Sequence, residues 1–276
     1  MEKVIARNRE ALGLEGEKLH RIIGGSFPIL PPDTINVDYE VIPLRVMDGC
    51  THHCGFCQFK TDKKCKIRTR ENIVEQLLSL KELLRDDLIN YNSLVLGENN
   101  ALAAGVEILE FAAQKAFEML GLGKSYYQGD PNLFLFGSVD FFLEAGESSF
   151  ERLNTLPYNI YLNIGLESPD DDTLNLIGKL LTADDVREAF QKALYINAAY
   201  DRINITSNFI LGKYLPRKHM EKLKTLLAEV KRRQEKGTVY LSPLIGASER
   251  RQILKEFKEI KRASLLPVYL YLMQRL

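Results

Sequence analysis

Residues 39–57 read YEVIPLRVMDGCTHHCGFC, a short apolar run that passes directly into a loop with three cysteines. The apolar part, Tyr39–Val46, has the length and composition of a buried strand. Cys50, Cys54 and Cys57 follow it with C-x₃-C-x₂-C spacing. Three thiolates on one loop can hold three corners of a cubane iron–sulfur cluster, and they leave the fourth iron open to an outside ligand. The stretch therefore predicts a strand that carries a reactive cluster at its end.

Zinc is the alternative metal for this loop. Cys65 is the only other cysteine of the chain, and with it the ligands would suffice for a Cys₄ site, or for a Cys₃His site that uses His52 or His53. Structural zinc sites usually pair two C-x₂-C knuckles, whereas the second half here is a lone cysteine. We therefore favour the cluster. In that case His52 and His53 either tune its sulfur atoms or face solvent, and Cys65 is either a catalytic hydrogen donor or an incidental thiol.

Short apolar runs alternate with amphipathic stretches through most of the chain, a pattern typical of a parallel sheet with helical crossovers. The expected strands are Tyr39–Val46, Ser93–Leu96, Leu133–Phe136, Tyr158–Ile164, Ile203–Leu211 and Val239–Leu241. The expected helices are Glu71–Arg85, Val106–Leu120, Phe141–Leu153, Ala183–Ala199, His219–Lys236 and Glu249–Arg262. Six βα units are too few for a closed eight-stranded barrel. The predicted fold class is therefore α/β, a partial (βα)₆ TIM-like barrel with parallel strands.

Three segments are expected along the 276 residues. They are an N-terminal helix and connector over residues 1–38, the barrel over 39–245 and a C-terminal helical extension packed on the barrel over 246–276. The apolar content of 45% is ample for one buried core. The longest late apolar run, Leu265–Met273, is far shorter than a bilayer span, and cysteine is sparse. We expect a cytoplasmic protein that has no membrane partner.

The loop motif Cys50-x₃-Cys54-x-Phe56-Cys57 resembles the signature of the radical S-adenosylmethionine (radical SAM) superfamily, which is C-x₃-C-x-aromatic-C. The resemblance implies a [4Fe-4S] cluster on the three cysteines, with S-adenosyl-L-methionine on the open iron and Phe56 beside this cofactor. It also implies an electron donor such as flavodoxin or ferredoxin. The electron cleaves the cofactor, and the resulting 5′-deoxyadenosyl radical abstracts hydrogen from a substrate.

Two strand ends resemble cofactor-binding segments of the same superfamily. Gly97 and Glu98 are similar to the Gly-Gly-Glu segment that receives the cofactor's ammonium group. Residues 165–168, Gly-Leu-Glu-Ser, are similar to the strand ending in the branch of coproporphyrinogen dehydrogenase and the Elongator-type enzymes, which implies that Glu167 and Ser168 lie at the ribose or the methionine end. From the residues alone, a turn with a helix cap is the alternative for the first pair, and the aspartates after Ser168 are best explained as a helix cap.

The same resemblance implies cofactor-binding residues in two more segments. Lys179 stands near the place of an arginine that meets the cofactor carboxylate. Ile203–Leu211 resembles the strand that flanks adenine, which implies that Asn208 reaches the ribose and that Ile210 and Leu211 supply an apolar wall and backbone contacts. Alternation along the strand does not decide which of these side chains faces inward.

The charge distribution bears on partners. Lys plus Arg and Asp plus Glu both number 37, yet residues 211–276 hold 16 Lys or Arg against 6 Glu. This basic end leaves RNA open as a partner, although charges on helices usually mark a solvated face. The sequence predicts a radical SAM enzyme that acts on a small-molecule substrate. The alternatives are radical modification of RNA or protein, and a non-catalytic protein that binds zinc or an iron–sulfur cluster with S-adenosylmethionine.

Overall fold

The computed structural model describes residues 8–27, 29–50, 65–97, 100–244 and 250–272. Within this part of the chain, the main sheet has seven strands, all parallel, in the order β1-β4-β5-β6-β7-β8-β9. Their bounds are β1 Ile42–Leu44, β4 Ser93–Leu96, β5 Asn132–Gly137, β6 Asn159–Glu167, β7 Ile203–Leu211, β8 Val239–Pro243 and β9 Val268–Leu270. The strands follow chain order across the sheet, so every crossover connects neighbours, and this arrangement curves the sheet into an open barrel.

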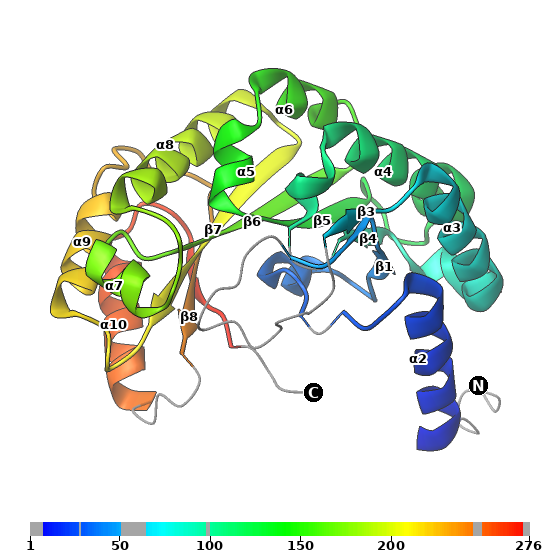
Figure 1. Ribbon diagram of the computed structural model, residues 1–276, viewed down its shortest axis with the longest axis horizontal. Helices are drawn as coiled ribbons and strands as arrows, with labels where there is room; N and C mark the ends of the chain where they lie inside the picture. The colour runs from blue at the N-terminus through cyan, green and yellow to red at the C-terminus, as the bar shows by residue number, and fades with distance from the viewer. Residues whose placement is uncertain (1–7, 28, 51–64, 98–99, 245–249, 273–276) are drawn as a thin grey trace.

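Helices cover the outer side of this curved sheet (Figure 1). The longer ones are α3 Arg70–Leu84, α4 Val106–Leu120, α6 Glu147–Asn154, α8 Ala183–Ala199, α9 Arg217–Leu227 and α10 Arg250–Ala263, with the short α5 Val139–Glu144 and α7 Asp171–Leu176 after β5 and β6. Each outer helix buries one apolar face; on α4, for example, Ala112 and Ala116 are fully buried. Small residues at this spacing let a helix approach its neighbours closely.

The fold class is confirmed: the protein is α/β, with a partial parallel barrel and an N-terminal helix, α2 Arg9–Ile23. The sheet is one strand larger than the six expected, because β9 pairs with β8 within the segment expected to be helical. Three residues of strand carry little local signal, and β9 forms because β8 offers it an open edge. Helix α9 also ends at Leu227, well before the expected Lys236.

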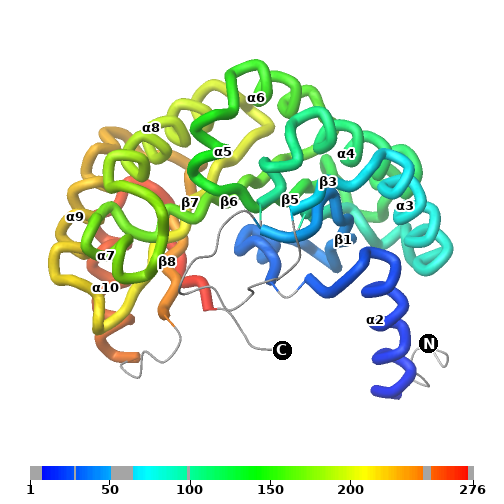
Figure 2. The backbone as a smooth tube through the Cα atoms, in the orientation of Figure 1, coloured from blue at the N-terminus to red at the C-terminus, as the bar shows by residue number. Residues whose placement is uncertain are grey.

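A short 3₁₀ turn lies inside the hollow of the sheet. This turn, η1 Pro32–Asn36, follows the connector after α2, and Figure 2 traces the blue chain from α2 into the concave side. Its Asp33 is buried against β7 and β8, where it accepts hydrogen bonds from Thr206 and Tyr240. The connector is therefore part of the barrel interior.

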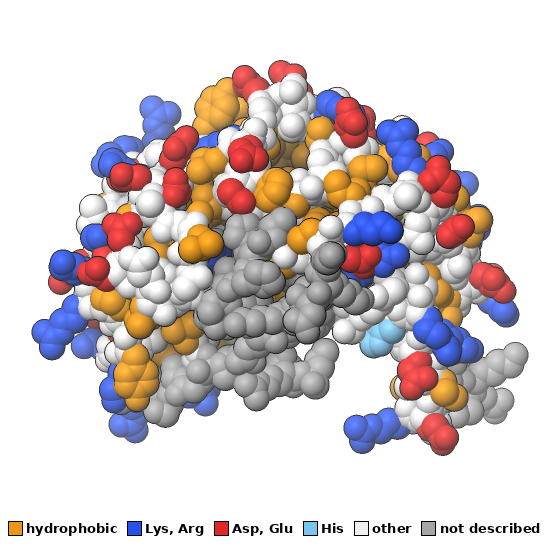
Figure 3. All heavy atoms as spheres, in the orientation of Figure 1, with side chains coloured by type: hydrophobic (Ala, Val, Ile, Leu, Met, Phe, Trp, Pro, Cys, Tyr) orange, Lys and Arg blue, Asp and Glu red, His pale blue; other side chains and the backbone are white. Residues whose placement is uncertain are grey.

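In the described residues, we find no helix with both the length and the apolar character needed to cross a bilayer. Charged side chains line the outer edge of the molecule, over the helices, as Figure 3 shows. The basic residues of α9 and α10 are largely exposed there, and some are paired, as in Lys224 with Glu259 at 2.8 Å. This placement fits a solvated helical face.

Candidate functional site

The base of the cysteine loop is a two-stranded antiparallel ribbon. Strand β2, Met47–Asp48, pairs with β3, Lys66–Ile67, directly after β1. The ribbon brings the two ends of the loop together: Cys50 is half-buried on the incoming side and Cys65 is exposed on the outgoing side. His52, His53, Cys54, Phe56 and Cys57 lie outside the described residues, so their predicted roles stay predictions.

An ion pair joins the two sides of this ribbon. Arg68 donates from Nη2 to Asp48 Oδ1 at 2.6 Å, and it passes so close to Gly24 that a Cβ there would lie 2.7 Å from Nη2. Gly24 ends α2 in the left-handed conformation, at φ 74°. Arg45 is buried beside Asp48 and donates to the Ser26 carbonyl at 2.9 Å. Backbone and guanidinium groups thus hold the loop's base from two sides.

The end of β4 provides a close backbone approach. Gly97 has φ 73°, a left-handed conformation that favours glycine, and its N–H donates to the Leu44 carbonyl at 3.0 Å. A Cβ at this position would lie 3.2 Å from the Ala101 Cβ. Glu98 lies outside the described residues. Gly97 therefore lies directly after β4 and next to the end of β1, the strand that precedes the cysteine loop.

The end of β6 holds a nearly buried ion pair. Lys179 Nζ lies 3.2 Å from Glu167 Oε1 and donates to the Gly165 carbonyl at 2.8 Å. Glu167 itself has φ 60°, a strained value for a non-glycine residue. A Cβ on Gly165 would come within 2.5 Å of Glu167 Oε1. The structure thus brings Glu167 and Lys179 together, so the lysine neutralises the glutamate at the rim.

Ser168, the next residue, belongs to an interior contact. Its Oγ lies 2.7 Å from His219 Nδ1 and accepts from the Asp170 N–H, and the side chain is fully buried. His219 Nε2 lies 2.9 Å from the Ile210 carbonyl. Burial lowers the pKa of His219, so the ring is neutral: Nε2–H donates to the carbonyl, and Nδ1 accepts from the serine. This contact ties the end of β6 to the end of β7 through α9.

The aspartate after this segment caps a helix, as the sequence analysis favoured. Asp170 accepts from the Thr173 N–H at 3.1 Å at the start of α7. Its other oxygen lies 2.8 Å from Lys222 Nζ. Burial raises the pKa of Asp170, but the hydrogen bonds from Lys222 and Thr173 outweigh it and hold the pKa below its ordinary value. This carboxylate is engaged in structure.

The structure shows which side chains of β7 face the hollow of the sheet. Thr206 contacts η1 in the hollow, so Asn208 and Ile210, two and four residues further along, lie on the same concave face. Phe209 and Leu211 alternate with them and pack in the core on the helical side. The Leu211 carbonyl accepts a hydrogen bond from the Leu244 N–H at 2.8 Å. Because its side chain packs in the core, Leu211 is no part of a concave wall.

A line of polar side chains crosses the concave face. Asn208 donates to Asn163 Oδ1 at 2.7 Å, Asn163 donates to Thr206 Oγ1 at 2.8 Å, and Thr206 donates to Asp33 Oδ2 at 2.8 Å. Tyr240 donates to Asp33 Oδ1 at 2.8 Å. Burial raises the pKa of Asp33 to about 6, although both hydroxyls lower it. Sequence analysis missed Asp33, and the only signal was a charged residue directly after the two prolines of the connector.

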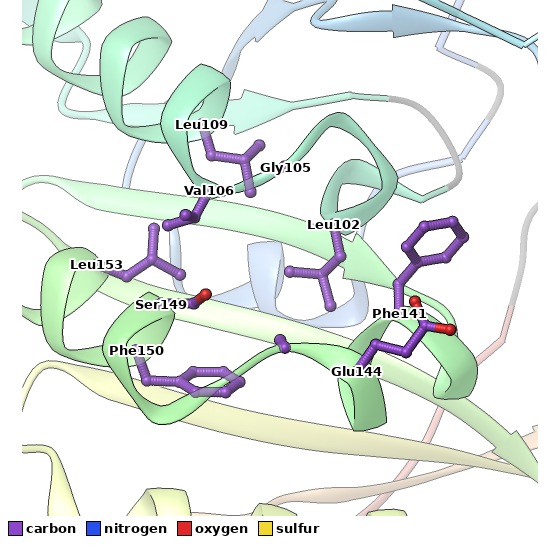
Figure 4. Close-up of a pocket in the computed structure, with 10 residues that line it drawn as sticks. Leu102, Gly105, Val106, Leu109, Phe141, Glu144, Ser149, Phe150 and Leu153 are labelled. Carbon is purple, nitrogen blue, oxygen red and sulfur yellow. The ribbon is translucent and has the colours of Figure 1, made fainter.

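A small pocket elsewhere is not part of this site. It has a volume of about 180 Å³ and lies between α4, α5 and α6, where Phe150 and Leu153 face Val106 and Leu109 (Figure 4). Binding sites for molecules of cofactor size usually measure 300 Å³ or more. The pocket is too small for S-adenosylmethionine, and the ends of the strands remain the candidate.

The family model of the radical SAM superfamily matches residues 44–227, which spans the ribbon-held loop and the ends of β4, β6 and β7. The chain belongs to the radical SAM superfamily. It is thus a radical SAM enzyme of a subtype that the family match does not specify. No curated protein matches the chain.

Two solved structures share the fold with TM-scores above 0.5. The FeFe-hydrogenase maturase HydG from Carboxydothermus hydrogenoformans superposes with a TM-score of 0.54 at 12% identity, over 96% of this chain and 59% of that one. The apo form of the cobalamin-dependent S-adenosylmethionine radical enzyme OxsB gives 0.52 at 13% identity, over 83% of this chain and 32% of that one. Coproporphyrinogen III oxidase HemN from Escherichia coli gives 0.48 at 12%, over 94% and 52%. The chain spans about a third to three-fifths of these proteins' lengths.

The described rim residues fit the cofactor that this family implies. Asn208 Oδ1 is buried and has no hydrogen-bond partner among the described residues. A buried acceptor without a donor is unfavourable, and a ribose hydroxyl would satisfy it. Gly97 adds a backbone that a ligand can approach closely. The cysteine loop begins on the adjoining strand, as an iron-bound cofactor would require.

Proposed function

We propose that this chain holds a [4Fe-4S] cluster on Cys50, Cys54 and Cys57 and binds S-adenosylmethionine across the ends of β4, β6 and β7. When bound and reduced, the cluster would supply one electron to S-adenosylmethionine, and the two groups together would provide a 5′-deoxyadenosyl radical for hydrogen abstraction from the substrate, with methionine as the other product. The observation that carries the proposal is the buried, unsatisfied Asn208 oxygen on the same rim as a ribbon-held cysteine loop.

The chain's own residues then have separate tasks. The Asp48–Arg68 pair fixes the entry of the cysteine loop. Gly97 allows the cofactor's amino acid end to approach the backbone, and Glu98 is the proposed carboxylate for its ammonium group. Glu167, held by Lys179, offers a carboxylate of fixed orientation. These groups bind and orient the cofactor and exclude water from its reacting end.

The proposed substrate is a small molecule. A substrate that reaches the rim from the hollow meets the inner face of the sheet, where η1 and the polar line from Asp33 to Asn208 already fill space. Concave sites suit small ligands better than folded macromolecules. The proposed location is the cytoplasm, with a flavodoxin or ferredoxin as electron donor. Modification of RNA or of a protein is the second candidate, supported by the basic residues 211–276.

The decisive test is anaerobic reconstitution followed by reduction with S-adenosylmethionine present. The proposal expects 5′-deoxyadenosine and methionine in equal amounts. To identify the substrate, deuterated metabolite pools and bulk transfer RNA are offered separately, and deuterium in 5′-deoxyadenosine marks the pool that donates hydrogen. Bound cluster and cofactor without cleavage under strong reductant would favour a non-catalytic binding protein. Stoichiometric zinc and no iron uptake would favour a structural metal site.

A further inference from the structure

The polar line across the concave face has a direction that chemistry imposes. An ionised carboxylate can only accept hydrogen bonds, so the single hydroxyl proton of Thr206 must point to Asp33. Thr206 Oγ1 then accepts from the amide nitrogen of Asn163, and this turns the Asn163 carbonyl oxygen toward Asn208. Asn208 must donate to that oxygen, which turns its own carbonyl oxygen away from Asn163. One charge therefore sets the orientation of two amides.

The far end of this line lies at the cofactor rim. In the sheet register, Asn163 of β6 stands opposite Thr206 of β7. Gly165 stands opposite Asn208, two residues closer to the carboxyl ends of these strands. Lys179 donates to the Gly165 carbonyl and forms an ion pair with Glu167. The Asn208 oxygen that the line turns outward is the buried acceptor that lacks a donor among the described residues.

From this geometry we infer that Asp33 is a positioning residue for cofactor binding. Through Thr206 and Asn163, its carboxylate holds the Asn208 amide with the oxygen toward the rim, where it accepts a hydrogen bond from a hydroxyl of S-adenosylmethionine. This role rests on the proposed function, because it assigns the ligand of Asn208. Without the line, the Asn208 amide could rotate and present its NH₂ group, a donor where an acceptor is needed.

Tyr240 supplies a matched control. It donates to the other oxygen of Asp33 and so touches the same carboxylate, but it does not belong to the line that ends at Asn208. Removal of its hydroxyl raises the pKa of Asp33 further, since this hydrogen bond lowers it. The comparison is made at pH 8, which lies above the pKa of about 6 that Asp33 has in the original chain, so that the carboxylate of that chain is ionised and the line is oriented. Thr206→Val and Tyr240→Phe each remove one hydroxyl that donates a hydrogen bond to Asp33, and only the first change interrupts the line.

The first experiment measures S-adenosylmethionine affinity of the reconstituted protein at pH 8. Thr206→Val and Asn208→Ala should each weaken binding about three- to tenfold, the usual effect of one neutral hydrogen bond. The double variant should bind no more weakly than Asn208→Ala alone, because both changes remove the same contact. Tyr240→Phe should stay within about twofold of the original chain. Thr206→Ser keeps the hydroxyl and should restore binding, which separates loss of the line from loss of folding.

The second experiment needs no cofactor. In protein labelled with ¹⁵N at asparagine, the side-chain amide signals of Asn163 and Asn208 should both move in Thr206→Val and stay in place in Tyr240→Phe. If the original chain binds no S-adenosylmethionine, the proposed function fails while these signals still report the line. Unmoved Asn208 signals, or additive affinity losses in the double variant, would overturn the inference. So would moved signals combined with unchanged affinity in Thr206→Val.

Discussion

Asp48 and Arg68 stand on opposite sides of the cysteine loop and are joined by an ion pair of 2.6 Å. Their side chains are 17% and 22% exposed, so the pair is mostly shielded from solvent. Such pairs contribute more than surface pairs do, and this one closes the loop at its base. The strength of this closure should govern how firmly the loop retains a metal cluster.

Arg68→Met should therefore loosen the loop. We expect the free energy of unfolding to fall by about 1–2 kcal/mol, since Asp48 loses its closest partner. Reconstituted protein should also lose iron to a chelator several times faster than the original chain does. Lys115→Met is the control, because it breaks an exposed ion pair with Glu118. Equal rates of iron loss in the original chain and in Arg68→Met would refute the anchoring role.

The ligand set is testable by iron content. Replacement of Cys50, Cys54 and Cys57 with alanine should abolish binding of about four irons per chain, the content of one cubane. Cys65→Ala should retain the iron and the spectrum of the reduced cluster, because Cys65 is exposed directly before the outgoing strand of the ribbon. Loss of iron in Cys65→Ala alone would instead indicate a closed four-cysteine site.

Glu167→Gln tests the rim carboxylate. It removes a charge that Lys179 holds in place at 3.2 Å, and the affinity for S-adenosylmethionine should fall roughly ten- to a hundredfold, equivalent to about 1.5–3 kcal/mol. Iron content should not change. Equilibrium binding at fixed ionic strength provides the measurement. Glu259→Gln is the control, since Glu259 pairs with Lys224 on the outer helices. An unchanged affinity in Glu167→Gln would contradict the assignment of this rim.

Gly165→Ala tests the same carboxylate through sterics. The added Cβ would lie 2.5 Å from Glu167 Oε1 and 3.2 Å from Lys179 Nζ, so the ion pair must shift. We expect S-adenosylmethionine affinity to fall several-fold. Gly13→Ala in α2 is the control, because its Cβ meets nothing within 4 Å. That change should stabilise the helix by up to about 1 kcal/mol. Equal affinities in both variants would place the cofactor away from Gly165.

Because the pKa of the buried Asp33 carboxyl is raised, we expect an unusual dependence of stability on pH. Its pKa is raised from 3.8 to about 6 in the folded protein, so between these values the folded state binds more protons than the unfolded state. Stability associated with Asp33 is therefore highest below pH 4 and falls as pH rises through 6. The change approaches roughly 3 kcal/mol, at 1.36 kcal/mol per pKa unit. Urea unfolding from pH 4 to 8 should show this decline in the original chain relative to Asp33→Asn. Parallel profiles would refute it.

Much of the fold follows from local pattern. The bounds of β4 and β7 agree with the expected strands at both ends. In β4 the signal is a short apolar run, and in β7 it is the β-branched and apolar residues at both ends of the strand. The spacing of three cysteines after β1 identified the family without any structure. The strand β9 was missed, because three residues depend on pairing with β8 more than on their own propensity.

Other features were decided by tertiary structure alone. Asp33 meets Thr206 and Tyr240 across separations of 173 and 207 residues, and no local pattern reports where a connector folds back into a barrel. The same contact decides that Asn208 and Ile210 face the hollow while Leu211 faces the helices. The alternation of side chains along a strand does not show which set faces the hollow until another segment packs on one face of the sheet. The sequence by itself determined six of the seven strands described in the main sheet and the cysteine motif, because these depend on neighbours in the chain. The buried charge and its line of amides needed the assembled barrel, because a carboxylate acquires its partners and its raised pKa only on burial.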